Sequence, residues 1–101
     1  MYLNDIAEQA HVLAKQRGFK TDVFSVLKHC TGEVTEAVEA NTRLMHTESP
    51  NMADVYSSEL ALELADVIIC ILTASYEAKI DIEKAIGEAM QKNARRAYEN
   101  S

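Results

Sequence analysis

The stretch ELADVIICIL, residues 63–72, predicts a buried helix that carries two acidic side chains. At about 100° per residue, apolar side chains cover most of the circumference of this segment, which is typical of a central helix. Glu63 and Asp66 lie three residues apart on the remaining polar stripe. Because an ionised carboxylate is costly at the edge of a core, we expect this stripe to face a group that compensates the charge.

A second acidic pair lies in the stretch GEVTEAVEA, residues 32–40. Glu33 and Glu36 are again three residues apart, and both flank one edge of the apolar stripe of their helix. Glu39 falls at about 180° from the apolar stripe and is expected to point into solvent. If the two helices pack side by side, the two acidic pairs can converge on one point.

Four converging carboxylates repel one another and lose hydration, so they require a compensating cation. Oxygen ligands without His or Cys suit Mg²⁺, with Mn²⁺ as an alternative. Solvated acidic faces are a competing interpretation, because Glu pairs at this spacing are common on exposed helices. The position of both pairs beside apolar stripes favours a metal site, which would consist of Glu33, Glu36, Glu63 and Asp66.

The composition narrows the possible functions. The chain has 101 residues, 48% of them hydrophobic, and a formal net charge of -6, so we expect a globular protein without a nucleic-acid partner. The N-terminal segment lacks the basic start and apolar stretch of a signal peptide, and no apolar run is long enough to span a bilayer. A cytoplasmic protein without a membrane partner is therefore expected. Cys30 and Cys70 lack the spacing of a zinc motif and are interpreted as reduced.

Helical periodicity along the chain, with one proline and three glycines, predicts an all-α fold. Four helices are expected at about residues 4–17, 22–45, 55–78 and 82–98. The segment HTESPNMAD, around Pro50, is expected to be a long polar loop. The helices would form a four-helix bundle with two long central helices, in a single domain over residues 1–101. Because one chain of this length can cover little of the apolar third helix, we expect a homodimer or homotetramer.

Three segments together resemble the MazG-like, all-α nucleotide pyrophosphohydrolases. They are GFKTDVFSVLKHCTGEVTEAVEANTR, ELALELADVIICIL and IDIEKAIGEAMQKNARR, and the resemblance covers roughly residues 10–96. The family combines a Glu-rich motif on one helix, an E-x-x-D motif on the next, and a Lys/Asn/Arg cluster on the last. This chain carries the two acidic pairs in that order, followed by Lys92, Asn93 and Arg96. The combination is far more specific than any single motif.

The resemblance implies hydrolysis of a nucleoside triphosphate between its α and β phosphates, to give a nucleoside monophosphate and pyrophosphate. It implies a house-cleaning or nucleotide-pool role and a Mg²⁺ ion, held by the four acids, that activates a water. Glu36 is the candidate general base, because it lies furthest from the apolar stripe. Lys92, Asn93 and Arg96 are the candidate substrate-binding residues. A competing interpretation is that the two cations complement the dipole of the last helix.

Many members of that family begin the first motif with two adjacent glutamates, and His29 and Cys30 stand in those places here. His29 is interpreted as a surface residue at the boundary of the stripe. Two alternatives stay open: a non-catalytic helical module for binding or regulation, and an enzyme like phosphoribosyl-ATP pyrophosphohydrolase. A di-iron carboxylate bundle is disfavoured, because it needs two E-x-x-H motifs and the sequence offers only Glu8 with His11.

Overall fold

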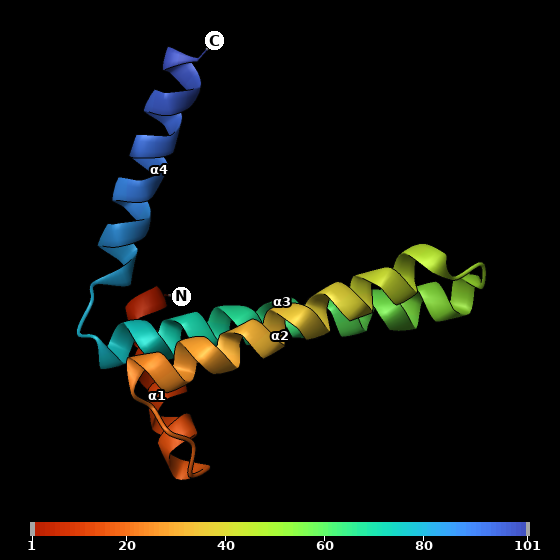
Figure 1. Ribbon diagram of the computed structural model, residues 1–101, viewed down its shortest axis with the longest axis horizontal. Coiled ribbons are helices and arrows are strands. Elements are labelled where there is room, and N and C mark those ends of the chain that lie inside the picture. Colours follow the sequence, from red (N-terminus) through yellow and green to blue (C-terminus); the bar gives the residue numbers. More distant parts are fainter. Residues whose placement is uncertain (1, 101) are drawn as a thin grey trace.

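The computed structural model describes residues 2–100, and within that range the chain is helical and has no strand. The helices are α1 (Leu3–Gln16), α2 (Val23–His46), α3 (Pro50–Glu77) and α4 (Ile82–Glu99) (Figure 1). The predicted all-α fold with four helices is therefore confirmed for the described residues. No helix in this range combines the length and the apolar character needed to cross a membrane.

α2 and α3 lie side by side and run in opposite directions as a long hairpin (Figure 1). They have 24 and 28 residues, and their mutual contact is the most extensive between any two described helices. The Asp22 carboxylate accepts a hydrogen bond from the Ser25 amide at the start of α2, and the Ser49 hydroxyl accepts one from the Met52 amide at the start of α3. Residues 47–49 alone separate the helices, so the chain reverses within a short turn.

α3 begins earlier than the sequence pattern indicates. Its first residue is Pro50, with Ser49 as the N-cap, whereas we predicted a start near Val55 after a long polar loop. That prediction is wrong, because a proline in the first turn of a helix needs no amide hydrogen and already has a helical φ. Residues 50–54 therefore extend α3 by more than one turn and lengthen the hairpin.

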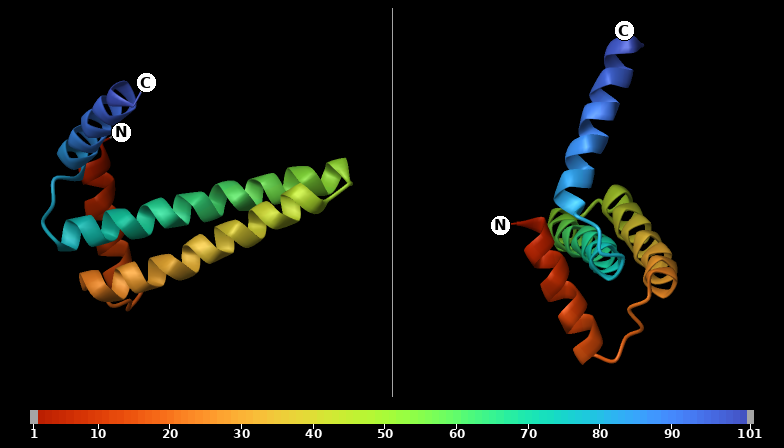
Figure 2. Two further views of the ribbon diagram at one scale, coloured as in Figure 1. Left: turned by 45° about the horizontal axis from the view of Figure 1, so that its top comes forward. Right: turned by 90° about the vertical axis from the view of Figure 1, so that its left-hand side faces the viewer.

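α1 crosses the hairpin near the C-terminal end of α3 (Figure 2). Small side chains allow a close approach, since Ala10 of α1 and Ala74 of α3 are both buried. The buried His11 imidazole bonds to the Glu77 carboxylate and ties the two helices together. Gly18 follows the end of α1 with a φ of +80°, a conformation that glycine adopts without strain.

Replacement of His11 by alanine is expected to destabilise the fold by about 2 kcal/mol. The substitution leaves a cavity under α1 and removes the partner of Glu77, whose side chain is 34% exposed. Urea unfolding at a fixed protein concentration, followed by circular dichroism, measures this change. The control is His46→Ala, because the exposed His46 imidazole bonds to a carbonyl of its own helix. An equal loss of stability in both variants would contradict the role given to His11.

α4 extends away from the α2–α3 hairpin (Figures 1 and 2). None of its residues within the described range is buried, and its main contact is with α1. Asn4 holds the start of α4: its side-chain Nδ2 donates to the Asp81 carboxylate over 2.9 Å, and its side-chain oxygen accepts from the Ile82 backbone amide over 3.1 Å. The expected four-helix bundle is therefore open within one chain, because α4 contacts mainly α1 and points away from the hairpin (Figure 1).

The open arrangement leaves much apolar surface uncovered. The Cα radius of gyration is 16.5 Å, compared with about 13 Å for a compact chain of this length. Large apolar side chains are exposed along both long helices, including Leu27, Val34, Val38, Met45, Leu64, Ile68 and Ile71. Exposed apolar surface of this extent is typical of a face that contacts another molecule.

Candidate active site

Three acidic side chains meet between α2 and α3. Glu33 and Glu36 of α2 and Glu63 of α3 each offer a carboxylate oxygen, and these oxygens all lie within 4.8 Å of one another. The spacing of three residues on α2 places both of its carboxylates on the side that faces α3. The antiparallel hairpin then brings Glu63 opposite them. The structure thus brings together three of the four acids predicted from the sequence.

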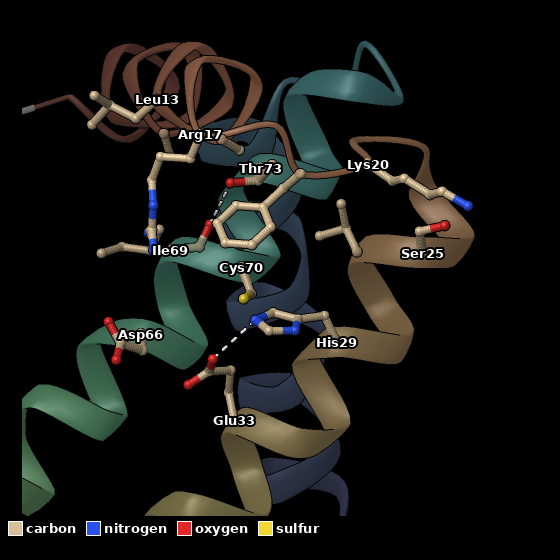
Figure 3. Close-up of a pocket in the computed structure, with 14 residues that line it drawn as sticks. Leu13, Arg17, Lys20, Ser25, His29, Glu33, Asp66, Ile69, Cys70 and Thr73 are labelled. Atoms are coloured by element: carbon tan, nitrogen blue, oxygen red, sulfur yellow. Dashed lines mark hydrogen bonds and ion pairs between the residues drawn. The ribbon is translucent and has the colours of Figure 1, made fainter.

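Asp66, the fourth predicted acid, lies at the edge of this cluster. It follows Glu63 by about one turn of α3, and it lines a cavity together with Glu33. Figure 3 shows Asp66 on α3 and Glu33 on the neighbouring helix α2. Its charge contributes to the electrostatics of Glu63, although its carboxylate falls outside the group of three.

The environment of Glu63 disfavours its ionised form. Burial is the main cause that raises the pKa of Glu63, and the neighbouring carboxylates of Glu36, Asp66 and Glu33 raise it further. Glu33 Oε2 and Glu63 Oε2 are buried and have no hydrogen-bond partner among the described residues. Unpaired buried carboxylate oxygens are unfavourable unless a cation binds them. This donor set fits a divalent ion that prefers oxygen ligands, as Mg²⁺ and Mn²⁺ do.

A cavity of about 660 Å³ opens beside the acidic side chains, between α1, α2 and α3 (Figure 3). Its apolar lining comes from all three helices, namely from Ala10, Leu13, Ala14, Val26 and Ile69. Glu33 and Asp66 contribute charge on the side of the acidic cluster. A mostly apolar cavity of this size with a few polar groups is typical of a small-molecule site.

The sequence analysis missed three residues that line this cavity, Arg17, Phe19 and Lys20. The Arg17 guanidinium lies 4.6 Å from the centre of the Phe19 ring, and the His29 imidazole stacks with the same ring at 6.2 Å. From the sequence, positive charge near the site was assigned only to Lys92 and Arg96 of the last helix. The available signal was Gly18, because a left-handed turn there folds its neighbours back toward α2.

The remaining predicted residues, Lys92, Asn93 and Arg96, are exposed on α4. None of them lines the cavity within the described part of the chain. The cause is the direction of α4, which leaves the hairpin from its first turn. Within one chain, therefore, the structure does not bring these three side chains to the acidic cluster.

Cys70 shares the cavity with the acids. Burial raises the pKa of the Cys70 thiol to about 11, and the charges of Glu33 and Asp66 add to this effect. The thiol is therefore protonated near neutral pH and is a poor nucleophile. Cys30 and Cys70 are both free, as the sequence analysis predicted.

The facing carboxylates beside a cavity in this all-α protein form a set of oxygen donors that suits a divalent cation. The chain matches the model of the MazG nucleotide pyrophosphohydrolase domain over residues 21–99, and it belongs to this family. The resemblance stated from the sequence is thereby confirmed. Comparison with curated proteins and with solved structures gives no match. Membership supports a hydrolase that acts on the phosphoanhydride bonds of nucleotides.

Proposed function

We propose that the protein is a Mg²⁺-dependent nucleoside triphosphate pyrophosphohydrolase. It cleaves a ribo- or deoxyribonucleotide between the α and β phosphates and releases a nucleoside monophosphate and pyrophosphate. The observation that carries the proposal is the group of Glu33, Glu36 and Glu63, whose oxygens lie within 4.8 Å of one another beside the cavity. Membership of the MazG family supports a nucleotide as the substrate.

The acidic residues take different roles in this proposal. Glu33, Glu63 and Asp66 would hold the ion together with Glu36, and a bound Mg²⁺ neutralises charge on the phosphate oxygens and acidifies water. Glu36 is the exposed member of the group of three, so its carboxylate is open to solvent. A carboxylate with one oxygen facing solvent can accept the proton of an attacking water.

The cavity would hold the nucleoside and part of the phosphate chain. Phe19 and His29 offer aromatic faces for stacking, and the apolar lining excludes water from the bound group. Arg17 and Lys20 bring positive charge to the same cavity and can pair with phosphate oxygens. A panel of ribo- and deoxyribonucleoside triphosphates with Mg²⁺, scored for monophosphate and pyrophosphate, tests the proposed reaction.

Asp66→Asn is expected to reduce Mg²⁺-dependent turnover by at least about tenfold while the helix content stays unchanged. The loss follows because the substitution removes a negative charge near the ion without changing the size of the side chain. It should be smaller than the loss caused by substitution within the group of three. Initial rates at saturating Mg²⁺ measure it, and full activity in this variant would remove Asp66 from the metal site.

We propose further that the functional unit is a homodimer or a higher homo-oligomer. Leu64, Ile68 and Ile71 are exposed on the face of α3 opposite Asp66, where none of the described helices covers them. A second copy is the favoured occupant, because a partner's α4 could also supply the cluster of Lys92, Asn93 and Arg96. Such a dimer would close the bundle that one chain leaves open.

A further inference from the structure

Three side chains of different chemistry meet on one side of the acidic cluster. They are His29 and Glu33 of α2 and Cys70 of α3, and one ligand atom of each lies within 4.8 Å of the other two. His29 Nε2 and Glu33 Oε1 are 3.0 Å apart. Figure 3 shows the Cys70 sulfur beside the His29 ring, and a dashed line joins the same ring to the Glu33 carboxylate.

We propose that His29, Glu33 and Cys70 form a second metal site, which takes a divalent transition-metal ion, with Zn²⁺ as the best fit. Nitrogen, oxygen and sulfur ligands together suit Zn²⁺ or Co²⁺ and do not suit Mg²⁺, which requires oxygen ligands. Three protein ligands leave one position of a tetrahedral ion open, and all three residues line the cavity. Coordination displaces the proton of a cysteine thiol, as it does in other zinc sites.

The burial of Glu33 supports this site independently of the distances between the three ligand atoms. Its side chain is only 15% exposed, and its Oε2 atom is buried without a hydrogen-bond partner in the described structure. Its other oxygen already faces His29, whose side chain is 62% exposed. A buried carboxylate in need of a positive partner thus lies between a nitrogen and a sulfur ligand.

Glu33 belongs to both clusters, because it also groups with Glu36 and Glu63. An ion held by His29 and Cys70 would therefore compete with Mg²⁺ for this carboxylate. We expect micromolar Zn²⁺ to inhibit Mg²⁺-dependent turnover, a consequence that rests on the proposed function. The binding of the transition metal does not rest on it.

The competing explanation is simple packing. His29 and Glu33 are four residues apart on α2, where such ion pairs are common, and Cys70 would be a small apolar residue of the hairpin. The two explanations differ in whether the thiol binds a metal. That difference is visible in a spectrum.

The test is a titration of the purified full-length protein with Co²⁺, followed by absorption spectroscopy. The proposal predicts the near-ultraviolet charge-transfer band of a thiolate–Co²⁺ bond, together with the visible bands of a tetrahedral ion, and their displacement by Zn²⁺. Cys70→Ser should lose the charge-transfer band, and His29→Gln should weaken Co²⁺ binding by at least about tenfold. The matched control is Cys30→Ser, because it changes the other cysteine of the hairpin and should keep both sets of bands.

Absence of the charge-transfer band in the unaltered protein would overturn the proposal, as would its persistence in Cys70→Ser or its loss in Cys30→Ser alone. Cys70→Ala repeats the test if the serine variant loses its helical circular dichroism. In a separate assay, Cys70→Ser should raise the Zn²⁺ concentration that halves its own Mg²⁺-dependent rate. If no nucleotide is hydrolysed, the proposed function fails, and the Co²⁺ spectrum still decides the metal site.

Discussion

Glu63→Gln is expected to reduce Mg²⁺-dependent nucleotide turnover by at least about 100-fold, without unfolding the protein. Glu63 faces both acids of α2, and its Oε2 atom is buried and unpartnered among the described residues. Burial and the neighbouring carboxylates raise the pKa of Glu63, so its negative charge opposes folding in the metal-free protein. Removal of that charge should leave the metal-free protein as stable as before or more stable. Thermal unfolding in a chelator and initial rates in Mg²⁺ measure the two effects.

Glu39→Gln is the matched control for this prediction. Glu39 lies on the same helix as Glu33 but is exposed, and it was predicted from the helical angle to point into solvent. Its substitution should change neither turnover nor stability by a measurable amount. Unchanged turnover in Glu63→Gln would contradict the metal site. A chain that unfolds in this variant would show that Glu63 has a structural role instead.

Ile68→Lys is expected to convert the proposed homo-oligomer to a monomer, with a loss of turnover if the partner's α4 completes the site. The Ile68 side chain is 55% exposed in one chain, so a charge there should cost a monomer little. In a dimer that covers this face of α3, the same charge would be buried without a partner, which is strongly unfavourable. Light scattering coupled to size-exclusion chromatography at micromolar concentration measures the change in mass.

Val12→Lys serves as the control for the oligomer, because Val12 is similarly exposed but lies on α1. This variant should keep the mass of the unaltered protein. A monomer mass for the unaltered protein would contradict the proposed homo-oligomer. An oligomer that persists in Ile68→Lys would instead move the interface to another exposed apolar face, such as that of α2.

The helices could be predicted from the sequence where capping residues and periodicity agree. Asp22 and Asp81 cap α2 and α4 close to the expected positions, because their carboxylates accept hydrogen bonds from the next turn. The start of α3 was missed, because Ser49 and Pro50 fit both a loop and a helix N-terminus. The start of α4 is held by Asn4, in a contact between residues 78 positions apart that no local pattern encodes.

The acidic cluster could be predicted from the sequence for a physical reason. Helical angles place Glu33 and Glu36 on one edge of α2 and Glu63 on one polar stripe of α3. When the two helices pack antiparallel, the correct register alone brings these carboxylates together. The rest of the cavity was not accessible in this way. Arg17 and Phe19 reach it through the turn at Gly18, whose direction depends on tertiary packing.

The central claim is that the acidic cluster between α2 and α3 supports cleavage of the α–β phosphoanhydride bond. Phosphorus NMR of each ribo- and deoxyribonucleoside triphosphate, incubated with the protein and Mg²⁺, tests this claim most directly, because it identifies both products. The expected spectra for the hydrolysed nucleotides show a nucleoside monophosphate and pyrophosphate in equal amounts, and Glu63→Gln leaves the triphosphates intact. Release of a diphosphate and inorganic phosphate would contradict the claim, and so would a full panel left unchanged with Mg²⁺ or Mn²⁺, which would favour a non-catalytic binding module.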